Sequence, residues 1–463
     1  MQLTDFLFLF AFLPLALVLA LLAKGRPALR RGTMALLSLL FCASFGLTGL
    51  ALTSVEAGIV FFLARGMDGA PEKKRRALLV LGVIFSAGLL CYYKYTNFFF
   101  GILSLPAQKL LPAPVGVSFL TFLLISYLAD VYRGKAAAKA RFLDFWLYVF
   151  FFPKLMQGPL CRFEDFSSQI QSARRVEPDE IMDGISRLIL GLGKKTLLAG
   201  AAGAVSQEVF SLSADALGPA FAWMGAACYA MQIYFDFAGY TDMALGLAGL
   251  FGMRLPENFN SPYLAVSITD FWRRWHMSLS GWFRDYVYIP LGGSRCKKAR
   301  QLRNLLAVWL LTGLWHGANW TFLCWGLWFF FLLAMEKLWL GRLLARLPRA
   351  LGRLYALVCV CIGWVLFNSP TLSYAAGFLR AMLVRGAHAP DAGAWLYFCM
   401  RQYGLQLLLC VIFSTNAGKK LWARLGRTAA GEWLRLLFLA GILGLSVLSL
   451  SASGMQAFIY AQF

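Results

Sequence analysis

The most informative part of the sequence runs from residue 258 to residue 326 and reads NFNSPYLAVSITDFWRRWHMSLSGWFRDYVYIPLGGSRCKKARQLRNLLAVWLLTGLWHGANWTFLCWG. It contains two of the chain's three histidines, in unlike settings. His276 lies in the basic and aromatic run WRRWHMS, which predicts a position at or near a membrane surface. His316 lies in LLAVWLLTGLWHGANWTFLCW, which contains no charged residue. Because an ionisable side chain at membrane depth is costly to desolvate, His316 is a candidate functional residue.

The neighbours of His316 favour a functional role over a purely structural one. Gly313 and Gly317 form a GxxxG pair, which lets another helix backbone approach closely. The spacing of Trp309, Thr312, His316 and Asn319 predicts one polar and aromatic helix face, open beside the imidazole as a substrate channel requires. The alternative is a buried histidine that only donates a hydrogen bond to a carbonyl of the next helix.

Composition identifies a polytopic membrane protein. Hydrophobic residues make up 60% of the chain and charged residues only 14%, whereas a soluble domain has nearer a quarter charged. The net charge of +22 does not indicate nucleic-acid binding, because the basic residues lie in short clusters between apolar runs, as the positive-inside rule predicts. Ten scattered cysteines and three unpaired histidines indicate neither a disulfide framework nor a metal site.

The hydropathy pattern predicts an all-α protein of about eleven membrane crossings at about 20 residues each, with short re-entrant helices around a central tunnel. The first apolar run lacks a cleavage site and is expected to be a retained helix. Residues 160–184 are expected to form a surface loop with a short helix after Pro178. The candidate spans are 5–23, 34–52, 57–65, 77–93, 97–111, 115–129, 142–152, 185–210, 221–251, 304–315, 319–341, 354–368, 373–384, 394–414 and 433–450.

Basic loops predict the orientation of the chain in the membrane. The segment 24–31 follows the first span with four Lys or Arg residues, so this loop should be cytoplasmic and the N-terminus outside. The basic clusters at 73–76, 133–141 and 270–303 should face the cytoplasm as well, as should those at 342–353 and 419–427. The tail 454–463 should then emerge outside.

Several long motifs resemble the membrane-bound O-acyltransferases, and in particular their bacterial alginate O-acetyltransferase branch. The resemblance covers roughly residues 1–340 in order, and the whole chain is expected to form one transmembrane domain with its motif-bearing core at about 115–340 and a tail at 454–463. The motifs are VGVSFLTFLLISYLADVYRG (115–134), FFPKLMQGPLCRFEDF (151–166), YAMQIYFDFAGYTDMALGLAGLFG (229–252), PENFNSPY (256–263), DFWRRWHMSLSGWFRDYVYIPLGG (270–293) and GLWHGANWT (313–321).

The resemblance gives roles to both histidines. The family's essential histidine matches His316, and a neutral imidazole there can act as the base that takes a hydroxyl proton. The family's second histidine matches His276, which is expected to bind or orient the acyl donor unless it is a surface residue that bonds a loop. Asn319 and Trp315 are expected polar partners of the substrate.

Charged residues near these motifs have two possible roles each. Arg273, Arg274 and Arg284 either pair with the phosphates of coenzyme A or extend to lipid headgroups. Asp236, on one predicted helix face with Gln232, Tyr240 and Met243, must be paired or protonated if buried. It is expected to join a network with the Arg-rich segment or, with Tyr240, to line the tunnel.

The C-terminal FIYAQF (458–463) resembles the tail of the same bacterial branch, in which a tyrosine is proposed to carry the acyl group transiently. The resemblance therefore implies Tyr460 as a first acceptor and a two-step route. The alternative is an aromatic anchor in the membrane interface. His388, in a loop rich in turn residues, is expected to be solvated.

Together these features predict an O-acyltransferase of the bacterial cell membrane, most simply an O-acetyltransferase. It would take its acyl group from a cytoplasmic thioester, acyl-CoA or an acyl carrier, and bind no cofactor. The acceptor would be an extracytoplasmic polysaccharide, reached by way of a separate hydrolase-like partner protein that the resemblance implies. Two alternatives stay open: a D-alanyl transferase of teichoic acids, and a transporter of a small acyl compound.

Overall fold

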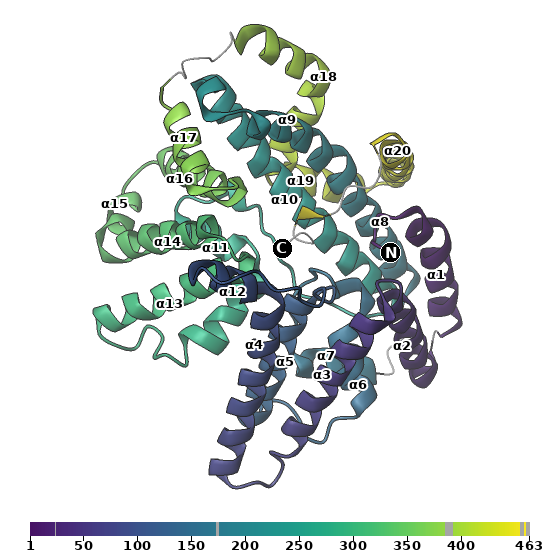
Figure 1. Ribbon diagram of the computed structural model, residues 1–463. Coiled ribbons are helices and arrows are strands. Elements are labelled where there is room, and N and C mark those ends of the chain that lie inside the picture. Colours follow the sequence, from purple (N-terminus) through teal and green to yellow (C-terminus); the bar gives the residue numbers. More distant parts are fainter. Residues whose placement is uncertain (24, 173–175, 385–391, 454–457, 460–463) are drawn as a thin grey trace. The chain divides into compact units, whose positions relative to one another are not determined.

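The computed structural model describes residues 1–463 except 24, 173–175, 385–391, 454–457 and 460–463 (Figure 1). Every regular element in these ranges is a helix, as predicted. Two apolar helices are short, Phe8–Leu22 and Val117–Tyr132, and the predicted count of eleven crossings stays a prediction. Seven described helices are long and apolar enough to cross a membrane: Leu47–Arg65, Glu72–Ile102, Pro178–Ser211, Trp320–Leu344, Arg349–Asn368, Gly393–Phe413 and Ala429–Ala452.

The described chain forms two compact units. The first comprises Met1–Leu188 and Tyr240–Glu257, and the second comprises Ile189–Gly239 and Asn258–Ile459. Two helices, α8 (Pro178–Gly193) and α10 (Pro219–Leu250), contribute residues to both. The single domain expected from the sequence stays a prediction.

The first unit is built from seven further helices and two short helical turns. Figure 1 shows α3, α4 and α5 running along one another, and an added Cβ at Gly82 of α4 would lie 2.5 Å from the Leu128 side chain of α5. The helices are α1 (Leu13–Leu22), α2 (Pro27–Ala43), α3 (Leu47–Arg65), α4 (Glu72–Ile102), α5 (Val117–Tyr132), α6 (Phe142–Phe150) and α7 (Phe163–Gln171), with the turns η1 (Phe8–Phe12) and η2 (Phe152–Lys154).

Two predicted boundaries in this unit are wrong. The chain turns at Gly46, where φ is +127°, and not between residues 52 and 57. A side chain is strained at that φ, so glycine is the residue that permits the turn. The spans predicted at 77–93 and 97–111 are one helix as far as Ile102, because α4 continues through Lys94, whose ammonium lies 3.3 Å from the Ser118 hydroxyl.

The segment 160–184 is not the surface loop that its polarity predicts. It contains α7, whose residues Phe163, Phe166 and Ile170 are buried. The predicted helix does begin at Pro178, but it continues into a span that ends at Ser211.

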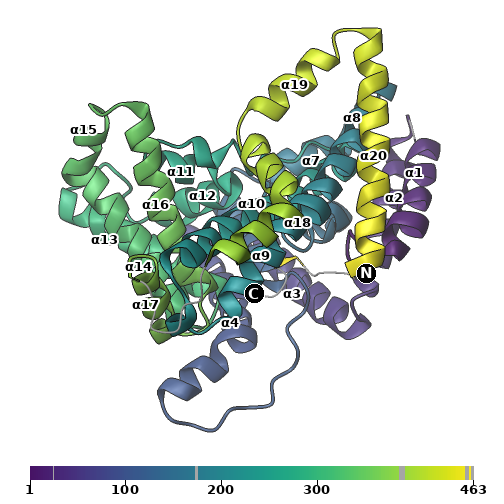
Figure 2. The ribbon, with the colours of Figure 1, turned by 90° about the horizontal axis from the view of Figure 1, so that it is seen from above.

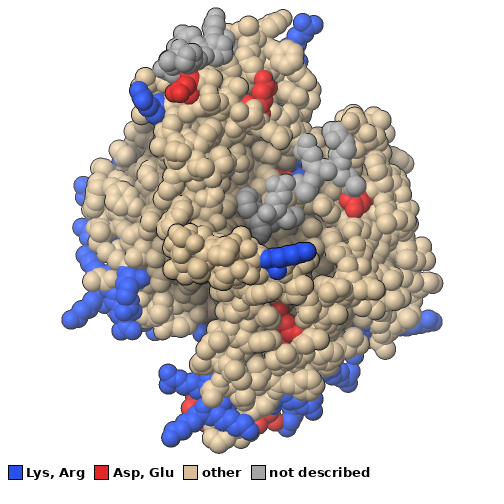
Figure 3. All heavy atoms as spheres, viewed as in Figure 1, with Lys and Arg blue, Asp and Glu red and all other residues tan. Residues whose placement is uncertain are grey.

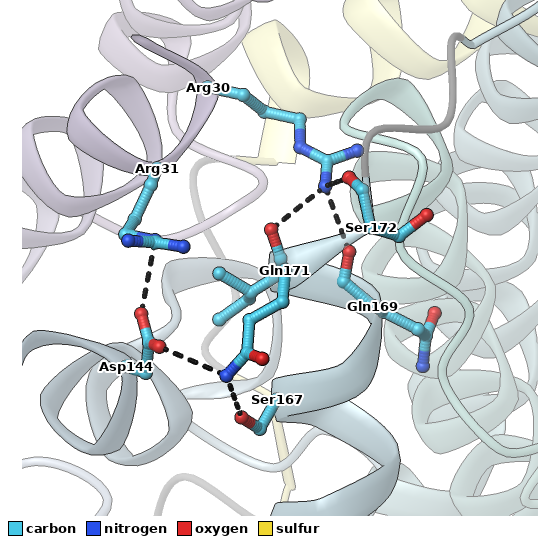
Figure 4. A network of polar contacts seen from close by, with 8 residues as sticks. Arg30, Arg31, Asp144, Ser167, Gln169, Gln171 and Ser172 are labelled. Carbon is cyan, nitrogen blue, oxygen red and sulfur yellow. Dashed lines mark hydrogen bonds and ion pairs between the residues drawn. The ribbon is translucent and has the colours of Figure 1, made fainter. Parts of the chain in front are cut away.

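Two arginines predicted in the first basic loop lie inside α2 and hold α7 in place (Figure 4). Arg30 is buried, and its Nη2 atom lies 2.7–3.1 Å from the carbonyl oxygens of residues 169, 170 and 172 at the end of α7. A helix end leaves such carbonyls without helical partners, and a cation satisfies them well. Arg31 forms an ion pair of 3.1 Å with Asp144 in the first turn of α6, and the Gln171 amide also contacts this carboxylate.

Basic side chains gather at the end of this unit where α3 passes into α4 (Figure 3). Arg65, Lys73, Lys74 and Arg76 are exposed there. The loop that follows α5 reaches the same end, since Lys139 forms an ion pair of 2.7 Å with Asp68. Two of the predicted cytoplasmic loops therefore lie on one side of the unit, as a shared orientation requires.

The second unit contains the histidine motifs. Figure 2 shows how α19 joins α18 to the long α20. Its helices are α9 (Gly200–Ser211), α11 (Ile268–Arg274), α12 (Met277–Phe283), α13 (Lys298–His316), α14 (Trp320–Met335), α15 (Gly341–Leu344), α16 (Arg349–Asn368), α17 (Leu372–Ala381), α18 (Ala392–Phe413), α19 (Ala417–Leu425) and α20 (Ala429–Ser453), with the turns η3 (Lys194–Ala199), η4 (Ala214–Ala216), η5 (Pro262–Leu264), η6 (Arg284–Tyr288) and η7 (Glu336–Leu340).

Glycines bring α13 and α14 into close contact, as predicted for Gly313 of the GxxxG pair, whereas Gly317 lies beyond the end of α13. A Cβ at Gly313 would lie 2.6 Å from the Phe322 carbonyl oxygen, and one at Gly326 would lie 2.5 Å from the Trp309 carbonyl oxygen. Backbone atoms cannot move aside as a flexible side chain can. These two positions therefore set the separation of the helices that flank His316.

Replacing Gly313 with alanine is expected to lower the free energy of unfolding by about 1–3 kcal/mol, the usual range for overpacking a core. Denaturation of the purified protein in detergent micelles measures this change. The matched control is Gly441→Ala in α20, where an added Cβ would meet nothing within 4 Å. The control should be neutral or stabilising by about 0.5–1 kcal/mol, because alanine is the better helix former. Equal effects of the two substitutions would contradict the close approach at Gly313.

Candidate active site

Two side chains cap the amino end of α11, the helix that precedes His276. The Ser267 hydroxyl accepts a hydrogen bond of 3.0 Å from the Asp270 N–H. The Glu336 carboxylate, from η7, accepts 2.7 and 2.8 Å bonds from the N–H groups of Ile268 and Thr269. A carboxylate suits this position because the amino end of a helix exposes N–H groups and a partial positive charge. Glu336 is buried, so it fixes the start of α11 from a distant part of the sequence.

His276 links α11 to α12 in a left-handed backbone conformation, with φ +44° and ψ +53°. Asn258 holds this link: its backbone carbonyl accepts 3.0 Å from the Met277 N–H, and its Oδ1 accepts 2.6 Å from the Ser278 hydroxyl. The same Oδ1 lies 3.4 Å from His276 Nδ1. His276 is only 2% exposed, so it is buried in the protein and is not the surface residue that one reading of the sequence predicts.

Burial also determines the charge of His276. Its ring packs edge-on against Phe237, with 4.7 Å between the centroids, and it lies outside the helices that qualify as membrane spans. Loss of hydration lowers the pKa of His276 from 6.5 to about 3. The imidazole is therefore neutral at physiological pH, and it can orient a donor by hydrogen bonding but not by charge.

Removing the Asn258 side chain is expected to loosen this link. Asn258→Ala removes an acceptor from the partly buried hydroxyl and N–H of Ser278, which is expected to cost about 1 kcal/mol or more of unfolding free energy. Asn260→Ala, in the same motif but exposed, is the matched control and should change stability by less than about 0.5 kcal/mol. Denaturation in micelles compares the two, and an Asn258→Ala protein as stable as the control would refute the role of Asn258.

The three arginines predicted to bind phosphate lie at or near the surface of the second unit. Arg274 pairs with Asp270 at 2.8 Å, and Arg284 pairs with Asp285 at 2.7 Å. Arg273 is exposed. The Arg274 pair is partly buried and the Arg284 pair is more exposed, and an exposed ion pair contributes little to stability. Their role in donor binding stays a prediction.

His316 is the last residue of α13 and is 4% exposed. Its ring meets Trp325 of α14 and Phe367 of α16 edge-on, each with 4.9 Å between the centroids. Trp315 contacts it from the same helix at 4.6 Å. The imidazole is thus bordered by aromatic rings from three helices.

Asn319 does not share a helix face with His316, because α13 ends at His316 and the chain turns at Gly317. Asn319 instead caps α14: its Oδ1 accepts 3.1 Å from the Thr321 N–H, and its Nδ2 donates 3.1 Å to the Pro370 carbonyl oxygen. Trp309 and Thr312 lie on α13, as predicted, but both are buried and do not form the predicted open face.

The ring of Trp315 lies near both histidines. Its ring centroid lies 4.6 Å from that of His316 and 6.3 Å from that of His276. One buried indole therefore borders both imidazoles, which come from segments 40 residues apart in sequence. The structure thus brings together His276, Trp315 and His316 within the second unit.

The two residues predicted on α10 have different partners. Asp236 is 1% exposed and pairs with Lys195 of η3, not with the Arg-rich segment that the sequence suggested. The Tyr240 hydroxyl donates 3.2 Å to the Pro153 carbonyl oxygen inside the first unit. Tyr460 and His388 lie outside the described residues, but Ile459, the residue before Tyr460, donates its N–H to Asp236 at 2.9 Å.

Three residues of this region escaped prediction. Asn258 stood in a recognised motif, but nothing in the sequence paired it with His276. Glu336 had a detectable signal, since it is a lone acidic residue after a long apolar run. Lys195 follows another lysine in an apolar context, and a buried lysine needs a carboxylate that only the fold can provide.

Comparison with known proteins identifies the family. Residues 134–369 match the model of the membrane-bound O-acyltransferase family, and the described part of that range holds both histidines. The chain is 39% identical over 391 residues to the probable alginate O-acetylase of Azotobacter vinelandii, covering 82% of this chain and 77% of that protein. It is 33% identical over 416 residues to the peptidoglycan O-acetyltransferase of Helicobacter pylori, covering 81% and 79%.

A more distant similarity extends over part of the chain. The teichoic acid D-alanyltransferase of Bacillus subtilis is 32% identical over 229 residues, which cover 46% of this chain and 56% of that protein. All three relatives are acyl or aminoacyl transferases by name. The chain therefore belongs to the membrane-bound O-acyltransferase family and is a multi-pass membrane acyltransferase.

Proposed function

We propose that this protein is an O-acetyltransferase that moves acetyl groups from a cytoplasmic thioester, acetyl-CoA or an acyl carrier, to a polysaccharide outside the cell membrane. The relatives named for alginate and peptidoglycan support a cell-surface polysaccharide as the acceptor. The basic segments support the orientation, with 270–303 and the α3–α4 loop in the cytoplasm and the C-terminal tail outside.

The observation that carries this proposal is the position of His316 at the end of α13, buried among aromatic rings and bordered by the indole that also borders His276. In the proposed reaction the imidazole takes the proton of an attacking hydroxyl. The hydroxyl oxygen forms a bond to the acetyl carbonyl carbon, the carbon–sulfur bond breaks, and the leaving thiolate receives that proton. A water-poor site favours this transfer because it excludes hydrolysis of the thioester.

Two acceptors fit this chemistry. In a two-step route, the phenol of Tyr460 takes the acetyl group first and a sugar hydroxyl then takes it from the tyrosyl ester. A separate extracytoplasmic hydrolase-like protein would complete the second transfer. In a one-step route, the sugar hydroxyl itself reaches the site near His316.

A D-alanyl transfer to teichoic acid is the second candidate, supported by the similarity to the Bacillus subtilis enzyme. That similarity covers 46% of the chain, whereas the alginate and peptidoglycan relatives each cover more than 80%. The acetyl reaction is therefore the better supported of the two.

The experiment is to delete the gene and to restore it as wild type or as His316→Gln. Acetate and D-alanine released from the cell envelope by mild alkali are then quantified. We expect acetate to fall on deletion and to return only with the wild-type gene. Purified protein should accept label from acetyl-CoA or an acetylated carrier. Loss of D-alanine alone would favour the second candidate, and unchanged esters of both kinds would refute both.

A further inference from the structure

The last described residues of the chain, Phe458 and Ile459, contact a buried ion pair between Lys195 and Asp236. Lys195 lies in η3, the π-helical turn inside the span 178–211, and Asp236 lies on α10. Their side chains are 8% and 2% exposed. Charges this deeply buried are stable only when each has a close partner of opposite sign and further hydrogen bonds.

The tail residues provide those further contacts. The Asp236 Oδ1 atom pairs with the Lys195 ammonium, and the Oδ2 atom accepts a 2.9 Å hydrogen bond from the N–H of Ile459. The Lys195 ammonium lies 4.6 Å from the ring centroid of Phe458, within the range of a cation–π interaction. Phe458 is fully buried. Both charges of the pair are therefore in contact with the C-terminal segment.

Close packing keeps this pair in place. An added Cβ at Gly239 would lie 2.7 Å from the Gly191 carbonyl oxygen of α8 and 3.1 Å from the Lys195 amide nitrogen of η3, so the backbone of α10 lies almost in contact with the junction of α8 and η3. The helix before the tail packs on the same turn, since the Ser449 hydroxyl of α20 lies 3.4 Å from the Thr196 carbonyl oxygen. Both α20 and Phe458 therefore contact the η3 turn.

We propose that the Lys195–Asp236 pair is a docking site for the C-terminal segment of the chain. The carboxylate recognises a backbone N–H at position 459, and the ammonium recognises an aromatic ring at position 458. The site fixes the chain immediately before Tyr460. The consequence for catalysis rests on the proposed function, because docking positions the tyrosine only if Tyr460 carries the acetyl group. Lys195 and Asp236 are then positioning residues.

The test uses a cysteine at position 458 in the full-length protein in micelles. In Phe458→Cys the thiol should react slowly with a maleimide, relative to the same thiol after denaturation, because the Ile459 bond still holds the segment. Adding Ile459→Pro removes the N–H donor without touching the interior pair, and labelling should accelerate about 10-fold or more. Adding Ile459→Val keeps the donor and should leave labelling slow. Peptide mass spectrometry separates this thiol from the ten native cysteines.

Rapid labelling of the single Phe458→Cys variant, or equal labelling with proline and valine at 459, would overturn the docking site. Because these substitutions lie in the tail, they test it without relying on variants of Lys195 or Asp236 that fail to fold.

An assay of acetyl transfer distinguishes the docking of the tail from the acyl-carrier role of Tyr460. Ile459→Pro should lower kcat about 10- to 100-fold with an unchanged KM for the thioester, as expected for a misplaced acceptor, whereas Ile459→Val should keep kcat near the wild-type value. If proline exposes position 458 but kcat stays at the wild-type value, the docking site stands and the role of Tyr460 in the proposed function fails. If labelling is unaffected by proline, the docking site fails whatever the activity.

Discussion

Replacing His316 with glutamine is expected to lower the rate of acyl transfer by about two to four orders of magnitude, the usual contribution of a positioned general base. Glutamine has nearly the size of histidine and can still form hydrogen bonds, but it cannot take a proton from a hydroxyl. The histidine ring packs against Trp325 and Phe367. Because glutamine is of similar size, the variant is expected to lose activity without a change of fold. Transfer of labelled acetyl from the thioester to the acceptor measures the effect.

The control for His316→Gln is Phe367→Leu, which disturbs the packing around the imidazole but keeps the base. This variant should lose stability while retaining activity within about 10-fold, since packing defects act on the free energy of unfolding. A His316→Gln protein that transfers acetyl at the wild-type rate would exclude His316 as the base. A Phe367→Leu protein as inactive as His316→Gln would indicate that the ring position, and not proton transfer, limits the rate.

Breaking the Lys195–Asp236 pair from one side is expected to lower the free energy of unfolding by about 3–5 kcal/mol, because it leaves one buried charge without its partner. Lys195→Met and Asp236→Leu each have this effect. The double variant should recover most of the loss, since two apolar side chains remove both charges together. Denaturation of the four proteins in micelles forms a complete double-mutant cycle.

A surface pair gives the matched comparison for this cycle. Lys139 and Asp68 form an ion pair of 2.7 Å with side chains 74% and 42% exposed. Their replacement should change stability by no more than about 1 kcal/mol. Single variants of Lys195 and Asp236 that are as mild as these, or a double variant that is worse than either single one, would contradict a tightly coupled buried pair.

The sequence allowed the helical class, the burial of His316 and the glycine contact at Gly313 to be predicted, because each depends on a local pattern. Boundaries failed where polar residues were taken as breaks. Glu56 and Lys94 lie inside α3 and α4, whereas the chain turns at Gly46. A helix in a large membrane protein tolerates a polar residue when another segment supplies a partner, and that partner is not visible in the local sequence.

The candidate site was predicted less well than the fold. Both histidines were identified, but the periodic face was extended past Gly317 and so included Asn319, which caps the next helix. The partner of Asp236 was sought in the Arg-rich segment and is Lys195, 41 residues earlier on η3. Long-range pairs of this kind depend on how helices cross, and neither spacing nor composition determines that.

The carboxylate of Glu336 has a consequence for the order in which this protein is made. Glu336 accepts hydrogen bonds from the first two N–H groups of α11, which lie 68 and 67 residues earlier in the chain. While the ribosome is still adding the intervening residues, α11 lacks the Glu336 carboxylate at its amino end. In a nascent chain stopped before residue 336, α11 should therefore not be stably folded. It should become protected from proteases only once η7 has been synthesised.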